Sequence, residues 1–179
     1  ASLHEVILRS GDEDKILVIS IDGRISDKSQ NTIFHQCPGM LQNIVSRLTM
    51  AQNDSAIKAV ILKINSMGGS ATVTDILYNE ILKFKKKTKV KIIAFIMDAA
   101  VSGGYYLSLT ADRIIAHPTS IVGCFKAVFA DSFNPNLNDA QNGMKDMSKA
   151  LTNRFVNLVA NRRNIKLTKL SAMSVSNIL

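Results

Sequence analysis

Residues 59–70, which read Ala-Val-Ile-Leu-Lys-Ile-Asn-Ser-Met-Gly-Gly-Ser, decide the fold of this chain. The stretch from Ala59 to Ile64 is apolar and rich in β-branched residues, which indicates a buried strand. Turn-forming residues end that strand, and Ser70 is suited to cap the helix that follows. The inner face of this helix is expected to contain Val73, Ile76, Leu77, Ile81 and Phe84.

The same succession of a strand, a turn and a helix recurs on both sides of this segment. Apolar runs that end in polar or turn-forming residues predict three further strands, at 16–21, 90–97 and 113–116. Apolar residues at helical spacing predict helices at 40–50, 102–111 and, after a loop, 139–163.

This alternation predicts an α/β fold with a parallel sheet, right-handed crossovers and helices on both faces of the sheet. Ligands bind to such sheets beyond the carboxyl ends of the strands. Two glycine pairs, Gly68-Gly69 and Gly103-Gly104, fall at those ends. We therefore expect a functional site at this edge of the sheet.

The composition suits a globular protein with a substantial core, because 46% of the 179 residues are hydrophobic. The two cysteines, Cys37 and Cys124, match no metal-binding spacing and indicate no disulfide framework, so no metal site is expected. No apolar run approaches the ~18 residues of a membrane span, and no signal peptide is visible. The chain begins Ala1-Ser2-Leu3-His4, which we interpret as a processed end or as a sequence without its upstream segment.

The formal net charge of +8 would suit nucleic acid or an anionic membrane surface as a partner. Much of the excess lies in one lysine-rich run, residues 83–91, which we interpret as a solvated helix end, with attraction to a membrane surface as the alternative. Aromatic residues make up 6% of the chain and there is no Trp, so few side chains could stack on nucleic-acid bases. A nucleic-acid partner is therefore not expected.

Ser102 has the most useful position for chemistry, since it follows a predicted strand and precedes a predicted helix. A helix N-terminus offers free N–H groups and a partial positive charge, and both favour a developing oxyanion. Gly103 and Gly104 let the backbone approach a substrate carbonyl, and Gly68 can contribute a second donor. The alternative is that Ser102 only caps the helix.

Two segments, Ile64–Ser70 and Asp98–Tyr106, the latter followed by Ala111–Thr119, resemble the bacterial signal peptide peptidase A family. The resemblance runs from about Lys15 to about Arg163. It implies the Clp-protease/crotonase fold and one catalytic domain over 1–179, with its core at about 15–163. It further implies a serine endopeptidase with a Ser–Lys dyad and no cofactor, with residues in these roles: Ser102 as nucleophile, Gly68 and Gly103 as oxyanion-hole N–H donors, and Lys126 as general base.

The role of general base places a requirement on the pKa of Lys126. A free lysine has a pKa of ~10.4, so a lysine base must have its pKa lowered toward the working pH. An apolar site does this by disfavouring the charged form, and Phe125, Val128 and Phe129 are suitable neighbours. Without the resemblance, Lys126 would be read as an exposed surface lysine.

The chain departs from the family pattern at several places. Met67 stands where the family usually has Pro, and Cys124 stands where a family Ser helps to hold the lysine. Cys124 is a poorer hydrogen-bond partner, or is simply a small buried residue. The family has a strand, a helix and a loop where Lys126 follows Cys124 by two residues, so a stretch between Cys124 and Phe125 is either deleted or omitted. The family's terminal Gly-Leu-Val-Asp pattern is also absent after Leu179.

The resemblance also implies partners and a cellular setting. Its substrates are signal peptides or other short apolar or unfolded peptides. In the family the serine and the lysine come from different units, so we expect a ring-like homo-oligomer whose sites are completed between protomers. We expect association with the bacterial cytoplasmic membrane through an upstream anchor that this chain does not show.

Three other interpretations remain open at this point. The related Clp proteases use histidine as the base, but His117 precedes Pro118 at a strand end and is read as a loop residue. The glycine pairs could instead polarise an acyl-CoA thioester, as in crotonases. The third interpretation is a catalytically impaired scaffold of the same fold.

Overall fold

The computed structural model of the protein describes residues 14–32, 35–123 and 138–168. The chain divides into two compact units, Ala1–Val122 and Gly123–Leu179. The elements in chain order are β1 (Lys15–Asp22), β2 (Gln30–Thr32), β3 (His35–Cys37), α1 (Met40–Gln52), β4 (Ile57–Ser66), α2 (Ala71–Thr88), β5 (Lys91–Val101), α3 (Gly103–Ser108), β6 (Arg113–Ala116), β7 (Ile121–Gly123) and α4 (Asn138–Arg163).

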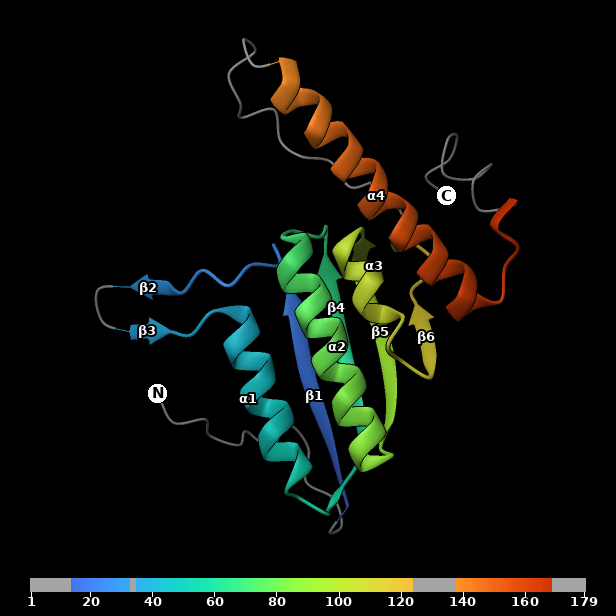
Figure 1. Ribbon diagram of the computed structural model, residues 1–179. Helices are drawn as coiled ribbons and strands as arrows, with labels where there is room; N and C mark the ends of the chain where they lie inside the picture. The colour runs from blue at the N-terminus through green and yellow to red at the C-terminus, as the bar shows by residue number, and fades with distance from the viewer. Residues whose placement is uncertain (1–13, 33–34, 124–137, 169–179) are drawn as a thin grey trace. The chain divides into compact units, whose positions relative to one another are not determined.

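A parallel sheet forms the centre of the first unit (Figure 1). Its strands lie in the order β1-β4-β5-β6, and β7 also pairs with β5. The β1–β4, β4–β5 and β5–β6 pairs are all parallel. This confirms the four strands and the α/β class that the sequence predicts, and the arrangement is that of a Clp/crotonase-like fold.

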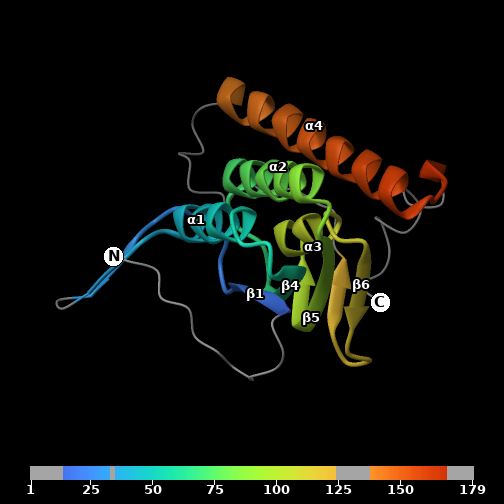
Figure 2. The same cartoon turned by 90° about the horizontal axis from the view of Figure 1, so that it is seen from below.

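Helices α1, α2 and α3 all lie on the same face of this sheet (Figure 2). The reason is topological: the strand order never reverses, so each right-handed crossover places its helix on the same side. The sequence-based expectation of helices on both faces therefore differs from what the described residues of this unit show.

The core lies between the sheet and these helices. Strand residues such as Leu62 and Ile64 are fully buried, as are Leu77 and Ile81 of α2. Burying a side chain of this size stabilises the fold by about 1.5–3 kcal/mol. Four of the five residues expected on the inner face of α2 are buried, but Ile76 is 40% exposed. Ile76 lies at one edge of the buried stripe of α2.

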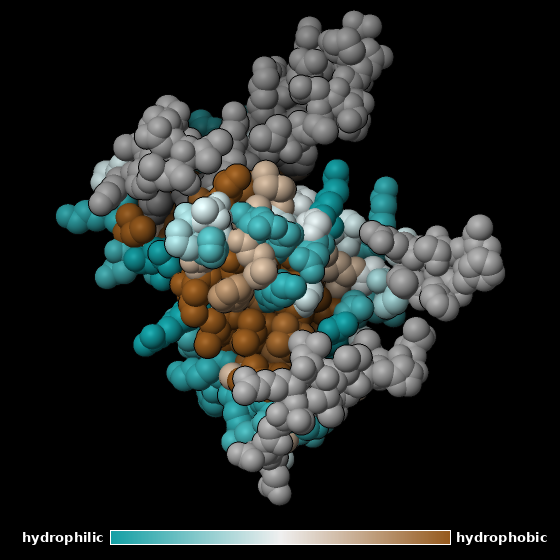
Figure 3. All heavy atoms as spheres, turned by 180° about the vertical axis from the view of Figure 1, so that it is seen from behind, coloured by the Kyte–Doolittle hydropathy of each residue, from teal (hydrophilic) through white to brown (hydrophobic). Residues whose placement is uncertain are grey.

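The opposite face of the sheet also carries apolar side chains. Register places Phe95 of β5 beside Ile115 of β6, and these residues are 40% and 46% exposed, while Ile16 of β1 is 62% exposed. Figure 3 shows apolar side chains gathered in the middle of this face. Parallel sheets usually have both faces covered, so this face is unusually apolar for one that lies open among the described residues.

Several local features were not predicted. The antiparallel β2–β3 pair joins polar strands of three residues each, which carry no alternating pattern. Strand β5 runs to Val101 instead of ending near Met97, and α3 has six residues and ends at Ser108 instead of near 111. The extension of β5 toward Ser102 goes with a change of register between β4 and β5.

The second unit contains the long helix α4, Asn138–Arg163, which confirms the helix predicted at 139–163. Phe155 and Val159 are buried, whereas Met147 is 57% exposed. After the helix, Asn164 has a positive φ of 52° and the Ile165 N–H donates to the Ala160 carbonyl, a common way to end a helix. Within the described residues, no helix combines the length and apolar character that a membrane span requires.

Candidate active site

A register shift between β4 and β5 shapes the carboxyl edge of the sheet. Ile64 pairs with Ile96, but the next pair is Ser66 with Ala100, so the chain advances two residues along β4 and four along β5. Such bulges bend a strand and re-aim its side chains, and they are frequent beside active sites. Here the bulge extends β5 to Val101, and Ser102 follows directly.

Ser102 has a strained backbone. Its φ is 50° and its ψ is −115°, a combination that glycine adopts easily and other residues rarely do. Ser102 directly precedes α3 but its side chain makes no capping hydrogen bond. The interpretation of Ser102 as a simple helix cap is therefore wrong, because a capping residue normally has an extended backbone and an engaged side-chain oxygen. Strain of this kind costs about 1–3 kcal/mol and clusters at functional sites.

Gly68 lies against Ser102 from the neighbouring strand end. A Cβ atom on Gly68 would stand 3.0 Å from the Ser102 Cβ and 3.0 Å from the Gly103 nitrogen. Gly68 also has a positive φ of 98°. Only glycine satisfies both conditions without strain, so the structure brings together Ser102, Gly68 and Gly103, three of the residues that the sequence predicts for the site.

The two glycines after Ser102 allow α3 to pack closely. A Cβ atom on Gly103 would stand 2.8 Å from the Thr74 Oγ1 atom of α2. One on Gly104 would stand 2.6 Å from the Ser66 carbonyl oxygen of β4. The absence of side chains at these positions therefore lets α3 rest directly on α2 and on the end of β4.

The two predicted oxyanion donors differ in their hydrogen bonding. Among the described residues, the Gly103 N–H has no acceptor, as expected in the first turn of a helix. The Gly68 N–H, in contrast, donates to the Ser66 Oγ atom at 3.1 Å. In this arrangement Gly103 presents a free donor beside Ser102, whereas Gly68 would have to exchange or share its partner.

Ser66 is a site residue that the sequence analysis did not single out. Its side chain is buried, with 2% exposure, and its hydroxyl donates to the Gly23 carbonyl at 2.6 Å. The same oxygen accepts the Gly68 N–H. The sequence signal that could have identified Ser66 is a hydroxyl residue between an apolar strand and a glycine turn. A serine buried at such a place needs hydrogen-bond partners in the adjacent backbone.

The segment after β1 holds the glycine turn from its other side. The Ile25 N–H donates to the Gly68 carbonyl at 3.0 Å, and the Ile25 carbonyl accepts the Ser70 N–H at 2.8 Å. Ser70 caps α2, as predicted, by accepting a hydrogen bond from the Val73 N–H. Backbone bonds on both sides therefore fix the turn before α2 begins.

Tyr106 ties α3 to α2. Its hydroxyl donates to the Asp75 Oδ1 atom at 2.8 Å, and its ring packs edge-on against that of Tyr78 with 5.0 Å between centroids. Tyr106 lies four positions after Ser102, and Asp75 and Tyr78 belong to the N-terminal half of α2. They hold the helix that carries the Gly103 amide.

The lysine-rich run has a partly structural role at the other end of α2. The Lys85 ammonium lies 3.1 Å from the Asp112 carboxylate and donates to the Thr110 carbonyl at 3.0 Å. Burial acts to raise the pKa of Asp112, but the Ile92 N–H and the Lys85 ammonium outweigh it and lower that pKa. The sequence predicts that the lysine-rich run is a solvated helix end. Lys85 departs from this prediction, because its ammonium group has partners within the fold.

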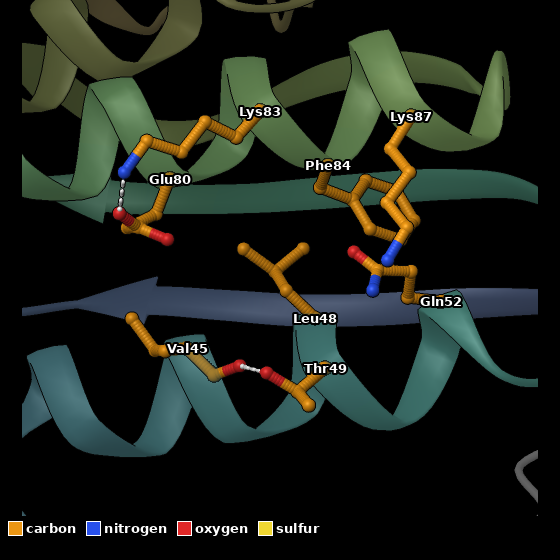
Figure 4. Close-up of a pocket in the computed structure, with 8 residues that line it drawn as sticks. All are labelled: Val45, Leu48, Thr49, Gln52, Glu80, Lys83, Phe84 and Lys87. Atoms are coloured by element: carbon orange, nitrogen blue, oxygen red, sulfur yellow. Dashed lines mark hydrogen bonds and ion pairs between the residues drawn. The ribbon is translucent and has the colours of Figure 1, made fainter.

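A pocket of about 270 Å³ lies between α1 and α2. Leu48 and Phe84 project into it from the two helices, and the Glu80–Lys83 ion pair lies at its edge (Figure 4). None of the predicted site residues lines it. Because α2 begins at the carboxyl edge of the sheet and runs away from it, this pocket faces the opposite end of the unit from Ser102.

The remaining predicted residues have separate outcomes. Lys126 and Cys124 lie outside the described residues, so their roles stay predictions. His117 lies in the loop between β6 and β7, as expected, and its exposed ring has Nδ1 2.8 Å from the Thr119 Oγ1 atom. That contact is local and does not connect the histidine to Ser102.

Comparison with known proteins gives several matches. Relatives include a protein of Enterococcus faecium provisionally named signal peptide peptidase SppA (29% identity over 70% of this chain). They also include Protease 4 of Haemophilus influenzae (38% identity over 62% of this chain). A third relative is the chloroplastic serine protease SPPA of Arabidopsis thaliana (30% identity over 68% of this chain). The chain spans only 36%, 17% and 18% of the lengths of these three proteins.

The family described as "NfeD1b, N-terminal domain" matches residues 33–166. This match covers β4, the glycine turn, α2, β5 and α3 around Ser102, together with α4. The chain therefore belongs to the NfeD1b N-terminal domain family and is related to the signal peptide peptidase A family.

Proposed function

We propose that the protein is a serine endopeptidase in which Ser102 is the nucleophile. The observation that carries the proposal is the strained backbone of Ser102 beside the close approach of Gly68. A fold holds a serine in this conformation only when the surrounding contacts compensate for the strain. The names of the relatives, which include two proteases, support the same reaction class.

The reaction proceeds through an acyl-enzyme in two steps. The Ser102 Oγ attacks the carbonyl carbon of the scissile bond as Lys126, in neutral form, accepts its proton. The C–N bond then breaks, the proton passes from Lys126 to the leaving amine, and the acyl group stays on Ser102. Water, deprotonated by Lys126, attacks the ester, and the proton returns to Ser102 as the acid product leaves.

The oxyanion of each tetrahedral intermediate forms beside the Gly103 N–H. This donor follows the nucleophile directly and has no acceptor among the described residues. One such donor is worth about 3 kcal/mol of transition-state stabilisation. The Gly68 N–H joins it when the substrate oxygen shares or replaces the bond to Ser66.

The proposed substrates are signal peptides or other short apolar or unfolded segments. The name of the Enterococcus relative, a signal peptide peptidase, supports this class. We further propose that the protein acts as a membrane-associated homo-oligomer in which one protomer contributes Ser102 and another contributes Lys126.

The proposal is tested by cleavage of a synthetic signal peptide. The wild-type protein should cleave it, whereas Ser102→Ala and Lys126→Met should each lower the rate at least a thousandfold, as expected for the loss of a nucleophile or its base. Lys86→Ala, which removes an exposed lysine of α2, serves as the control and should retain the wild-type rate.

Mixing the two inactive variants tests the shared site. If sites form between protomers, a mixture of Ser102→Ala and Lys126→Met should regain part of the activity, because some sites then combine an intact serine with an intact lysine. A fully active monomer in light scattering, or a mixture without activity, would contradict the shared site. A wild-type protein that cleaves no peptide would contradict the peptidase itself and favour a scaffold of the same fold.

A further inference from the structure

The turn at Met67–Gly69 has a buried anchor. The Ser66 hydroxyl donates to the Gly23 carbonyl at 2.6 Å and accepts the Gly68 N–H at 3.1 Å. One oxygen atom therefore connects the turn after β1 with the turn after β4. With 2% exposure of Ser66, no water competes strongly for these bonds.

The backbone of Ser66 connects the same point to α3. The Ser66 carbonyl lies where a side chain on Gly104 would be, at 2.6 Å from the ideal Cβ position. Ser66 is also the residue at which pairing with β5 resumes after the bulge, opposite Ala100. It thus contacts all three segments that meet at Ser102: the β1 end, the glycine turn and the start of α3.

We infer that Ser66 is a positioning residue for the reaction at Ser102, an inference that rests on the proposed function. Gly68 must stay within a van der Waals contact of Ser102 if its amide is to reach the oxyanion. Apart from Ser66, no described side chain bonds to the turn, and the other anchors are two backbone bonds, from the Ile25 N–H to the Gly68 carbonyl and from the Ser70 N–H to the Ile25 carbonyl. Loss of the hydroxyl leaves the amide side of the turn without an anchor.

The opposite role, in which Ser66 blocks the Gly68 amide, would give the opposite result. A blocking hydroxyl would make Ser66→Ala faster than the wild-type protein, since the amide would be released to the substrate. A positioning hydroxyl makes the variant slower. The direction of the change in rate therefore separates the two roles.

The experiment compares the wild-type protein, Ser66→Ala and Ser108→Ala. Ser108 is a matched control, because it is a fully buried serine whose hydroxyl donates to the Tyr105 carbonyl at 2.7 Å and does not touch the turn. Two quantities are measured: labelling of Ser102 by a fluorophosphonate, resolved into maximal rate and half-saturating concentration, and amide hydrogen exchange of Gly68. Selective ¹⁵N-glycine labelling gives a simple spectrum, since the chain has nine glycines.

Ser66→Ala should lower the maximal labelling rate about tenfold with a half-saturating concentration within about twofold of the wild-type value, because a lost anchor affects the transition state more than binding. The Gly68 amide should exchange at least about tenfold faster, since its acceptor is gone. Ser108→Ala should change neither quantity by more than about twofold. An unchanged or faster labelling rate in Ser66→Ala, or unchanged Gly68 exchange, would overturn the inference.

The proposed function and the positioning role of Ser66 are contradicted by different results. If the wild-type protein is not labelled at Ser102, the proposed function fails, and Ser66 has no reaction to support. If the wild-type protein is labelled but Ser66→Ala is labelled equally fast, the proposed function stands and the positioning role is overturned. The Gly68 exchange measurement decides in either case whether the Ser66 hydroxyl holds the turn.

Discussion

Gly68 and Ser102 lie so close that a methyl group on Gly68 would stand 3.0 Å from the Ser102 Cβ atom. The two residues are 34 positions apart in the chain and meet because β4 and β5 are neighbouring parallel strands that end at the same edge. The register shift between these strands brings their ends together at this point.

Gly68→Ala should impair both folding and reactivity. The added Cβ would meet Ser102 and the Gly103 nitrogen, and the φ of 98° disfavours any side chain. We expect a loss of about 2 kcal/mol or more in the free energy of unfolding, measured by urea denaturation, and loss of labelling at Ser102.

Gly143→Ala is the matched control for that substitution. Gly143 lies in α4, and a Cβ atom there would meet nothing within 4 Å. Alanine favours a helix over glycine by up to about 1 kcal/mol, so this variant should be as stable as the wild-type protein or slightly more stable. Equal destabilisation by both substitutions would show that the Gly68 contact has no special cost.

Ser102→Gly should stabilise the protein while abolishing its activity. The φ of 50° and ψ of −115° at Ser102 suit glycine, so the substitution relieves strain of about 1–3 kcal/mol. Glycine also gains entropy in the unfolded chain, which offsets up to about 1 kcal/mol of this benefit. Ser102→Ala keeps the strain and should be less stable than Ser102→Gly in urea denaturation. If alanine is as stable as glycine at this position, the backbone is not strained.

Gly103→Ala should be destabilising, and its cost should depend on Thr74. The new Cβ would stand 2.8 Å from the Thr74 Oγ1 atom and 3.4 Å from its Cγ2 atom. Thr74→Ala removes both atoms, so the double variant should be more stable than the sum of the two single effects predicts, by about 1 kcal/mol. Strict additivity of the unfolding free energies would contradict the packing of α3 on α2 described above.

Asp112 should make part of the stability sensitive to acid. Burial acts to raise its pKa, but the Ile92 N–H and Lys85 hold the pKa below the usual value of 3.8 in the folded state. A lowered folded pKa stabilises the fold above the unfolded pKa, and this contribution is lost as the pH falls through the folded pKa. Urea denaturation from pH 7 to pH 2 should therefore show a smaller acid-dependent loss of stability in Asp112→Asn than in the wild-type protein.

Lys85→Met provides the partner measurement for Asp112. It removes the ammonium that lies 3.1 Å from the carboxylate, so it should also reduce the acid-dependent part of the stability. The Ile92 N–H would remain as a partner of Asp112, and the reduction should therefore be smaller than in Asp112→Asn. An acid response in Asp112→Asn equal to that of the wild-type protein would contradict this account.

Much of the fold could be predicted because it depends on local patterns. The apolar run from Ala59 to Ile64, the turn after it and the cap at Ser70 are all contained in twelve residues. The position of Ser102 at a strand end follows from the same kind of pattern. The side on which the helices lie could not be predicted in this way, because it depends on the strand order, which no local pattern encodes.

The finer features of the site depend on contacts between distant residues. The bulge in β5 arises from its pairing with β4, and the role of Ser66 depends on Gly23, which lies 43 positions earlier. Neither relationship has a signal within one segment. Lys126 presents the reverse case, because the family resemblance assigns it a role while its position lies outside the described residues.

Covalent labelling is the decisive test of whether Ser102 is an activated nucleophile. The intact, folded protein is treated with a fluorophosphonate, and the modified residue is identified by peptide mass spectrometry. We expect one phosphonylated residue, Ser102, and no modification of Ser102→Ala. Absence of labelling in the folded wild-type protein, or labelling that persists in Ser102→Ala, would contradict it.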